Sequence, residues 1–563
     1  NIKEVIDFFN GNIDSNGILL ANNTDAWTID GNSFYETQSF TASGFPNYHV
    51  INVSNNIGVN FKILNNYIGG SNEQCTGTAW TKMNATNNAF SGISMNVGVS
   101  TTSSIQNNTI QNFNWGNSSN ANWTGIEVLG GNVNVGTITG NTIGSTTVND
   151  LITVTGAISG LNVYGIKISG NDSVNCLNNL IGSITTNNAA ARASNIYGIY
   201  KGNSLGTTVI SDNFIGSTTI ADNINASSSS TNNNQLVYGI FNAGVGTITI
   251  SNNSISSLTN GTTNTSTGSL GVVHGINSSA GTISVLDNEI YNLSNANANN
   301  SVENNASVIG VSLTGVAGVK TIKGNTIYNL ENTFASFSGS VIGLYYNGSL
   351  VGVNTVYENF IYGLSVNSSS TAASIYGIKI AGGVATYANN IISLGGNTRS
   401  DIYGIYMTSI ISNNYSIFYN TIYIEGNVAS GTNNSYALFS NAAVNVRDIR
   451  NNIFMNARST TGGSNLHYAA YFNYSSNTNI TLNYNNYYAP GTGGVLGYWN
   501  STNQASLPII TGQDANSLAI NPTFTAAGGT DFLNYIASSN LPGQAISILV
   551  DYEGIGRDNP PKM

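Results

Sequence analysis

A three-residue phrase, Asn-x-Ile, recurs along almost the whole chain. It appears in stretches such as "IKGNTIYNL", "ILNNYIGG" and "ISNNSISSL". Its Asn positions are separated by 30 to 42 residues and by 35 on average. A period of this length is typical of solenoid proteins, in which each repeat packs mainly on its neighbours. The phrase falls at Asn66, Asn108, Asn141, Asn179, Asn213, Asn253, Asn288, Asn325, Asn359, Asn390 and Asn420, and continues in weaker form at Asn452 and Asn486.

A second phrase, an aromatic or small residue followed by Gly-Ile, alternates with the first. It reads "YGI" at Gly165 and Gly377, and Ala replaces the Gly at Ala437 and Ala469. From this Gly to the next Asn there are 13 to 17 residues, whereas from the Asn to the next Gly there are 14 to 26. One half of the repeat therefore has a nearly constant length, and we expect the other half to form loops along one edge. The variable halves contain low-complexity sequence at residues 225–235, 260–269, 295–307 and 367–374.

The repeats have the pattern of strands rather than helices. Alternating β-branched and aromatic residues surround both phrases, as in "YGIKI" and "TITIS", and Gly and Asn interrupt them every few residues. Leucine-rich repeats would need Leu at fixed offsets and a shorter period. The sequence therefore predicts an all-β parallel β-helix of about 12–13 coils.

The first residues differ from the repeats. "NIKEVIDFFNG" places Ile2, Val5, Ile6 and Phe9 at helical spacing, and Asn10-Gly11 is a helix stop. A short helix over the open end would cover strand edges that otherwise invite aggregation. We predict an N-terminal cap over 1–50 (this helix plus first strands), β-helix repeats over 51–490, and C-terminal coils or a cap over 491–563.

Each repeated residue has a sufficient structural role. The Ile of Asn-x-Ile is expected to point inward and stack on the Ile of neighbouring coils. The Asn is expected at a bend, because Asn tolerates the left-handed conformation, and to hydrogen-bond from coil to coil. The Gly of Tyr-Gly-Ile is expected at a tight corner or a small outward position. These roles favour architecture over catalysis or metal binding.

The composition excludes several classes of function. Charged residues make up only 7 % of the chain, against roughly 25 % in ordinary soluble domains. The few Lys and Arg are scattered, which argues against nucleic-acid binding. No apolar run approaches the roughly 20 residues that span a bilayer. A surface rich in amides and hydroxyls suits neutral partners such as glycans.

The cysteines and histidines give no sign of a disulfide framework or a metal site. Two cysteines, Cys75 and Cys176, are too few for a framework, and we favour two unpaired residues, with Cys176 inward on a strand, over a single bridge. The three histidines are far apart in the sequence. His274 takes the Tyr place of the second phrase, so architecture accounts for it. The sequence indicates no cofactor and no metal site; calcium stays an open alternative.

Some tyrosines follow the Ile of Asn-x-Ile and are expected to point outward as an aromatic stripe on the later coils. A glycan could stack on such a stripe, although stacked aromatic residues also stabilise a sheet without any ligand. We therefore name them as candidate ligand-binding residues and keep the structural alternative open. They are Tyr291, Tyr328, Tyr362 and Tyr423.

The cadence "GI…NTI" over about residues 50–490 resembles the right-handed parallel β-helix repeat shared by pectate lyases, polygalacturonases and many bacterial surface proteins. The tail, "TGQDANSLAINPTF" and "ISILVDYEGIGRDNPP", resembles the end of β-helix regions in large secreted proteins of Bacteroidota. In those proteins Asp-x-x-Gly-x-x-Arg, here Asp551, Gly554 and Arg557, is usually followed by a Gly-Ala-x-Glu phrase. The resemblance implies a type IX secretion substrate at the outer cell surface, and we expect a fragment or a processed product.

The enzymes of that family place clustered charges on one strand face. Here the acids are spread along the chain, and no Asp-Asp pair occurs. The best charge clusters are "KTIKG", with Lys320 and Lys323, and "VRDIR", with Arg447, Asp448 and Arg450. We favour solvated surface strands for these clusters.

Three hypotheses follow. The first is a secreted, surface-displayed β-helix for adhesion or glycan binding, with no catalytic residues. The second is a polysaccharide lyase or glycoside hydrolase of the β-helix type. The third is a structural rod or filament subunit. The expected partners are glycans or cell-surface material, and the secretion machinery if the chain is a type IX substrate.

Overall fold

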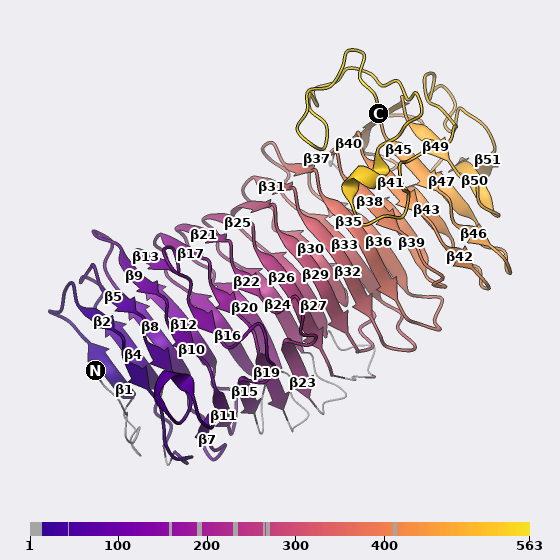
Figure 1. The fold of residues 1–563 in the computed structure, drawn as a ribbon. Helices are drawn as coiled ribbons and strands as arrows, with labels where there is room; N and C mark the ends of the chain where they lie inside the picture. Colours follow the sequence, from indigo (N-terminus) through magenta and orange to yellow (C-terminus); the bar gives the residue numbers. More distant parts are fainter. Residues whose placement is uncertain are drawn as a thin grey trace. The chain divides into compact units, whose positions relative to one another are not determined.

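The computed structural model shows an all-β parallel β-solenoid of about 13 turns. It describes residues 14–42, 44–156, 160–188, 194–228, 235–262, 265, 271–408 and 414–563. The chain forms two compact units: unit 1 comprises Asn1–Ile283 and Tyr291–Ala298, and unit 2 comprises Ser284–Ile290 and Asn299–Met563. Within each unit, strands of successive turns lie side by side (Figure 1).

Each turn contributes strands to three long sheets, here named A, B and C in the order in which the chain enters them. In unit 1, sheet A contains β1 (Ser15–Leu20), β4 (Tyr48–Ser54), β8 (Phe90–Asn96), β12 (Trp123–Gly130), β16 (Leu161–Ile168), β20 (Ser194–Lys201), β24 (Leu236–Asn242) and β27 (Val272–Ser278). Sheet B contains β2 (Thr28–Asp30), β5 (Lys62–Leu64), β9 (Ser103–Gln106), β13 (Val133–Val135), β17 (Val174–Leu177), β21 (Thr207–Ser211) and β25 (Thr247–Ser251). Sheet C contains β3 (Ser33–Phe34), β6 (Tyr67–Ile68), β7 (Trp80–Lys82), β10 (Thr109–Ile110), β11 (Phe113–Asn117), β14 (Thr142–Ile143), β15 (Ile152–Gly156), β18 (Leu180–Ile181), β19 (Ile184–Asn188), β22 (Phe214–Ile215), β23 (Ile224–Ser228) and β26 (Ser254–Asn260).

Unit 2 repeats this arrangement. Sheet A contains β30 (Val308–Thr314), β33 (Ser340–Asn347), β36 (Ser374–Gly382), β39 (Asp401–Met407), β43 (Ser435–Ser440), β47 (His467–Phe472), β50 (Gly494–Trp499) and the antiparallel β51 (Thr502–Gln504). Sheet B contains β31 (Lys320–Lys323), β34 (Thr355–Tyr357), β37 (Ala385–Ala388), β40 (Asn414–Phe418), β44 (Val446–Arg450) and β48 (Ile480–Asn483). Sheet C contains β32 (Thr326–Asn332), β35 (Phe360–Val366), β38 (Ile391–Leu394), β41 (Thr421–Ile424), β45 (Ile453–Asn456) and β49 (Asn486–Tyr488). A small parallel pair joins β42 (Asn427–Val428) to β46 (Ser459–Thr460). β28 (Thr282–Leu286) and β29 (Glu289–Asn295) are divided between the units.

The Asn of Asn-x-Ile forms a buried amide ladder, as expected. In unit 1 it joins Asn32, Asn66, Asn108, Asn141, Asn179, Asn213 and Asn253. In unit 2 it joins Asn288, Asn325, Asn359, Asn390, Asn420, Asn452 and Asn485. At each step the backbone N–H and the side-chain Nδ2 of one Asn both donate to Oδ1 of the next, as Asn359 does to Asn390 at 3.1 and 2.9 Å.

Two details of the predicted ladder were wrong. The left-handed residue is the one before the ladder Asn, for example Asn389 (φ 55°) before Asn390, because that residue turns the chain from sheet B into sheet C. The last rung is Asn485 rather than Asn486, since Asn452 donates to Asn485 Oδ1 at 2.9 Å. Ser517 then ends the ladder by accepting from the Asn485 N–H at 3.1 Å.

The Ile of Asn-x-Ile points inward and stacks from turn to turn, which confirms its predicted role. In unit 2, Ile327, Ile361, Ile392 and Ile422 align in register and are fully buried. Burying such apolar surface stabilises the fold at roughly 25 cal/mol per Å².

The Gly of Tyr-Gly-Ile faces this column, so its predicted corner or outward position was wrong. A Cβ at Gly377 would lie 2.5 Å from Ile392 Cγ2 and 2.7 Å from the Gly404 carbonyl oxygen. The same close approach recurs at Gly310, Gly343 and Gly404 against the Ile of the same turn. The two sequence phrases therefore pack on each other inside the solenoid.

The predicted N-terminal helix falls within residues 1–11, outside the described residues. The described part contains no α-helix, only two short 3-10 helices, η1 (Glu73–Cys75) and η2 (Phe532–Tyr535). β1, β2 and β3 already form a turn that pairs in parallel with the next one. The boundaries at residues 50 and 490 and the right-handed sense of the coil stay predictions.

Candidate ligand pocket beneath the C-terminal segment

Residues 505–563 are here called the C-terminal segment. They first pair with the edge of the last turn, as Leu518 does with Asn486, and then pass over the outer face of sheet C in unit 2 (Figure 1, yellow). Asn486 fixes the start of this path. Its Nδ2 donates to the Ile520 carbonyl at 2.9 Å, and its Oδ1 accepts from the Ile520 N–H at 3.1 Å. The only helix in the segment is η2, which Asp531 caps by accepting from the Leu533 N–H at 2.9 Å.

Tyr535 of η2 packs where the outer column of sheet C lacks an aromatic side chain. The register aligns Tyr328, Tyr362, Ser393 and Tyr423, so Ser393 interrupts the predicted stripe. The Tyr535 ring lies 5.8 Å from Phe360 and 6.2 Å from Tyr423, on the two sides of Ser393 in the register, and its hydroxyl donates to the Gly529 carbonyl at 2.7 Å. Tyr535 is only 4 % exposed. The C-terminal segment therefore supplies a ring that the repeat omits.

The Asp-x-x-Gly-x-x-Arg motif anchors the end of the segment. Asp551 Oδ1 accepts from the N–H groups of Glu553 and Ile555 at 3.0 and 2.9 Å, and Gly554 turns the loop with a φ of 77°. Arg557 donates to Asn389 Oδ1 at 2.7 Å, and its Cζ lies 3.6 Å from the centroid of the Tyr419 ring. Burial lowers the pKa of Arg557.

Both Asn389 and Tyr419 are left-handed corner residues. Asn451, the corner residue of the following turn, both accepts from Gln544 N–H at 2.8 Å and donates to its carbonyl at 2.9 Å. The corner between sheets B and C thus holds the segment by polar contacts with its backbone and with one guanidinium.

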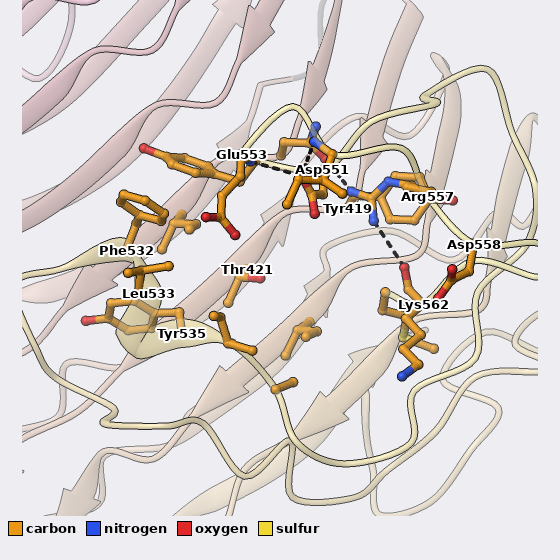
Figure 2. A pocket seen from close by; sticks show the side chains of 18 of the residues that line it. Tyr419, Thr421, Phe532, Leu533, Tyr535, Asp551, Glu553, Arg557, Asp558 and Lys562 are labelled. Carbon is orange, nitrogen blue, oxygen red and sulfur yellow. Dashed lines mark hydrogen bonds between the residues drawn. The ribbon is translucent and has the colours of Figure 1, made fainter.

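A pocket of about 380 Å³ lies between this segment and sheet C. Its floor consists of Ile391, Thr421 and Ile453, which occupy the middle position of Asn-x-Ile in three successive turns. Phe532 and Tyr535 form one wall, and the Asp551–Ile555 loop forms another (Figure 2). The volume falls within the range of small-molecule sites, roughly 300–1,000 Å³.

The charges around the pocket are arranged asymmetrically. In Figure 2 the carboxylates of Asp551 and Glu553 point from their loop toward Thr421, whereas Asp558 and Lys562 line the other side. Arg557 is turned away toward Tyr419 and Asn389. The pocket thus combines an apolar floor, aromatic rings and carboxylates.

The four tyrosines of the predicted stripe have different surroundings. Tyr328 and Tyr362 are partly exposed and stack on each other at 4.8 Å with an interplanar angle of 2°. Tyr423 is buried beneath the C-terminal segment at 6 % exposure, and its hydroxyl donates to Glu425 at 2.8 Å. Tyr291 belongs to unit 1 and is 7 % exposed. Ring faces that stack on one another present edges and hydroxyls to the surface, and the role of these residues in ligand binding stays a prediction.

Sequence reasoning missed two longer aromatic columns on the outer face of sheet A in unit 2. The first stacks Tyr376, Tyr403, Tyr436 and Tyr468 at 4.8–5.5 Å, and the second stacks Tyr406, Phe439, Tyr471 and Tyr498 at 4.1–5.1 Å. Rings of the two columns meet edge to face, as Tyr403 and Tyr406 do at 87°. The signal in the sequence was an aromatic residue three positions after the Tyr, as in "YGIY" and "YALF".

A buried cation closes one end of these columns. Lys379 aligns between Tyr345 and Tyr406 in the register of sheet A. Its Nζ lies 4.7 Å from the Tyr376 ring centroid and 2.9 Å from a Glu303 carboxylate oxygen. The columns therefore have a structural role of their own, since stacked cross-strand rings stabilise a sheet.

We predicted that both charge clusters lie on solvated surface strands. This prediction was wrong for one residue of each cluster, Lys320 and Arg447. Lys320 is fully buried, and its Nζ donates to the Ala317 carbonyl at 2.8 Å, whereas Lys323 is exposed and pairs with Glu358 at 3.2 Å. Arg447 is also fully buried, with its guanidinium 4.7 Å from the Tyr474 ring. Asp448 and Arg450 form a partly exposed ion pair. The two buried cations contact a backbone carbonyl and an aromatic ring, so they have a structural role.

The cysteines and His274, the remaining residues considered for catalysis or metal binding, have positions that the fold explains. Cys75 and Cys176 are free and buried, which confirms the unpaired interpretation, and burial raises the pKa of both thiols to about 12. His274 aligns with Tyr238, as expected from its place in the repeat. In the described part of the chain, no group of three His, Cys, Asp or Glu side chains could hold a metal ion. Among the same residues, no helix is long and apolar enough to cross a membrane.

Comparisons with known proteins identify no relative. The chain matches no protein-family model, no curated protein sequence and no solved structure.

Proposed function

We propose that the chain is a secreted β-solenoid module displayed at the outer cell surface, which binds glycans in adhesion and has no catalytic role. The observation that supports this proposal is the pocket beneath the C-terminal segment. An apolar floor, aromatic rings and polar groups meet there in one cavity of suitable volume.

The chemistry of the pocket suits a sugar ring. Ile391 and Ile453 on the floor and the ring of Tyr535 offer apolar surface to the CH groups of a sugar. The Thr421 hydroxyl and the carboxylates of Asp551 and Glu553 offer hydrogen-bond acceptors to its hydroxyls. Binding sites commonly combine such an apolar lining with a few polar groups.

The proposed location and partners rest on the sequence. The tail motif resembles that of large secreted proteins of Bacteroidota, which supports a type IX secretion substrate and contact with the secretion machinery. The same resemblance implies that the coil is right-handed. The low charge of the chain is compatible with a surface that meets neutral glycans.

A β-helix polysaccharide lyase or glycoside hydrolase is the second candidate. The observation in its favour is that Asp551 and Glu553 project into one pocket, since glycoside hydrolysis uses a pair of carboxylates. Release of oligosaccharides from a glycan panel would establish this alternative. For the third hypothesis, a structural rod, filaments seen by electron microscopy at high protein concentration would be required.

The test is a glycan array on the full chain, with calcium present and absent. Thr421→Arg places a long side chain on the pocket floor, and Thr326→Arg is its control, because Thr326 holds the same position of Asn-x-Ile in another turn of unit 2. We expect binding to a subset of glycans that Thr421→Arg abolishes and Thr326→Arg preserves. Uniform silence of the array, or equal binding by both variants, would contradict the proposal.

A further inference from the structure

We infer that the pocket beneath the C-terminal segment selects a sugar with a free, positively charged amine over neutral or acidic sugars. The inference deepens the proposed glycan binding and rests on it. It follows from the positions of the charged groups of the pocket and from the contacts that they already make within the protein.

Glu553 is an exposed acid of the pocket whose carboxylate points over the floor. Its backbone N–H donates to Asp551 Oδ1, but among the described residues its carboxylate forms no ion pair and no side-chain hydrogen bond. In Figure 2 this carboxylate points from the loop over Thr421, toward the middle of the pocket. A carboxylate next to apolar surface gains most from a cationic hydrogen-bond donor.

Asp551 adds a second negative charge on the same side. One of its oxygens, Oδ1, accepts two backbone N–H groups, from Glu553 and Ile555, and these bonds fix its position in the loop. The two carboxylates therefore come from one rigid turn, closed by the 3.2 Å bond from the Gly554 N–H to the Asp551 carbonyl.

The cations of the pocket do not neutralise Glu553. Arg557 stacks on Tyr419 and donates to Asn389 and to the Lys562 carbonyl, so its guanidinium faces the corner of the solenoid. Burial has the larger effect on the pKa of Arg557 and lowers it, and Asp551 is the pocket carboxylate whose charge raises it. Lys562 lines the side of the pocket opposite Glu553 (Figure 2), and among the described residues it forms no ion pair with Glu553. An incoming ammonium would meet carboxylates at one end and avoid these two cations.

The aromatic wall suits the same ligand. Phe532 and Tyr535 lie beside Leu533, and the Phe532 ring packs 4.7 Å from that of Tyr552. Aromatic faces attract cations as well as the CH groups of a sugar ring. An amino sugar would offer CH groups to the apolar floor and the aromatic wall, and a positive charge to the carboxylates. A uronic acid would place its negative charge next to that of Glu553.

The test compares binding of soluble oligosaccharides to the full chain by isothermal titration calorimetry at low salt. The probes are chitosan oligomers with free amines, the same oligomers N-acetylated, a neutral glucan oligomer and an oligouronate. We expect the free-amine oligomers to bind at least tenfold more tightly than the others and to weaken as salt is added.

Glu553→Gln separates this charge preference from shape. It should reduce the affinity for free-amine oligomers about tenfold and leave that for N-acetylated oligomers nearly unchanged. Asp222→Asn is the control, because Asp222 is an exposed acid of unit 1 whose amide would still accept from Thr259. Equal affinity for amine and N-acetyl oligomers, or no effect of Glu553→Gln, would overturn the inference and leave glycan binding standing. No binding of any oligosaccharide would overturn both.

Discussion

The outer faces of sheets A and C in unit 2 are covered in different ways. Sheet A carries two columns of aromatic residues that the repeat itself supplies, turn after turn. On sheet C the column is interrupted at Ser393, and Tyr535 from the C-terminal segment occupies that place. On this second face a segment with its own sequence crosses a surface with a regular one, and the pocket beneath the C-terminal segment lies between them.

The difference separates two roles of the sequence. The repeating half provides stability through the amide ladder, the Ile column and the stacked rings. The segment that does not repeat provides an individual arrangement of charges, with Asp551 and Glu553 on one side and Lys562 on the other. Changes in the repeat are therefore expected to unfold turns, and changes in the segment to alter binding.

Asn390→Ala should have the largest effect on stability. Asn390 is fully buried, accepts two hydrogen bonds from Asn359 and donates to Val356 and Asn420 at 2.9 and 2.8 Å. Each buried group left without a partner costs about 1–3 kcal/mol, so we expect a loss of about 3–5 kcal/mol in the free energy of unfolding. Chemical denaturation measures it. Asn477→Ala, at an exposed amide, should cost less than about 0.5 kcal/mol.

The buried His467 should make the sheet A side sensitive to acid. Its two ring nitrogens lie 2.9 Å from Ser435 Oγ and Thr460 Oγ1, and burial, followed by the charge of Arg458, lowers its pKa to about 4. Between about pH 6.5 and 4 the unfolded chain binds a proton that the folded chain does not, so stability falls as the pH falls. The loss from this group reaches up to about 3 kcal/mol. Unfolding of the wild type and of His467→Gln across this range should differ in slope, and parallel curves would refute the assignment.

Gly377→Ala tests whether the two repeated phrases pack on each other. The new methyl group would lie 2.5 Å from Ile392 Cγ2, and overpacking of this kind costs about 1–3 kcal/mol. Gly202→Ala is the matched control, because its nearest atom would be 3.5 Å away. Thermal unfolding should show a lower midpoint for Gly377→Ala only; equal midpoints would mean that the Ile column yields to the methyl group.

Arg557→Gln should have the smallest effect on global stability and a clear local one. The variant loses the contact with the Tyr419 ring, worth about 0.5–2 kcal/mol, while the amide ladder is untouched. Limited proteolysis should cut faster within residues 540–563, with the rest of the chain still resistant. Arg399→Gln, an exposed arginine bound to Ser430, should leave the cleavage rate as it is.

Much of the fold could be predicted from the sequence because the same residues recur at equivalent positions in almost every turn. The Asn and the Ile of each turn have one neighbour above and one below, so their spacing alone indicated an amide ladder and an apolar column. The weak last repeat did not identify its rung, since "YNNYY" offers both Asn485 and Asn486. The spacing of the second phrase did not reveal that its Gly packs against the Ile column.

The pocket could not be predicted, because it depends on contacts between residues more than a hundred positions apart. Tyr419 and Gln544 are joined by a hydrogen bond across 125 positions, and Asn389 and Arg557 across 168. The missing aromatic at Ser393 was visible as a gap in the stripe, but its partner Tyr535 lies outside the repeat. The tail motif was recognised by resemblance, and its anchoring role emerged only from the contacts of Asp551, Gly554 and Arg557.

The most direct test of this account compares glycan binding by two tyrosine variants. Tyr535→Leu removes a ring of the pocket wall, and Tyr436→Leu removes a ring of the repeated column on sheet A. Both variants should first be shown by circular dichroism to keep the β-solenoid. The account predicts that Tyr535→Leu loses at least tenfold in affinity and that Tyr436→Leu binds as the wild type does. Loss of binding in Tyr436→Leu with retention in Tyr535→Leu would contradict it and place the glycan on the repeat.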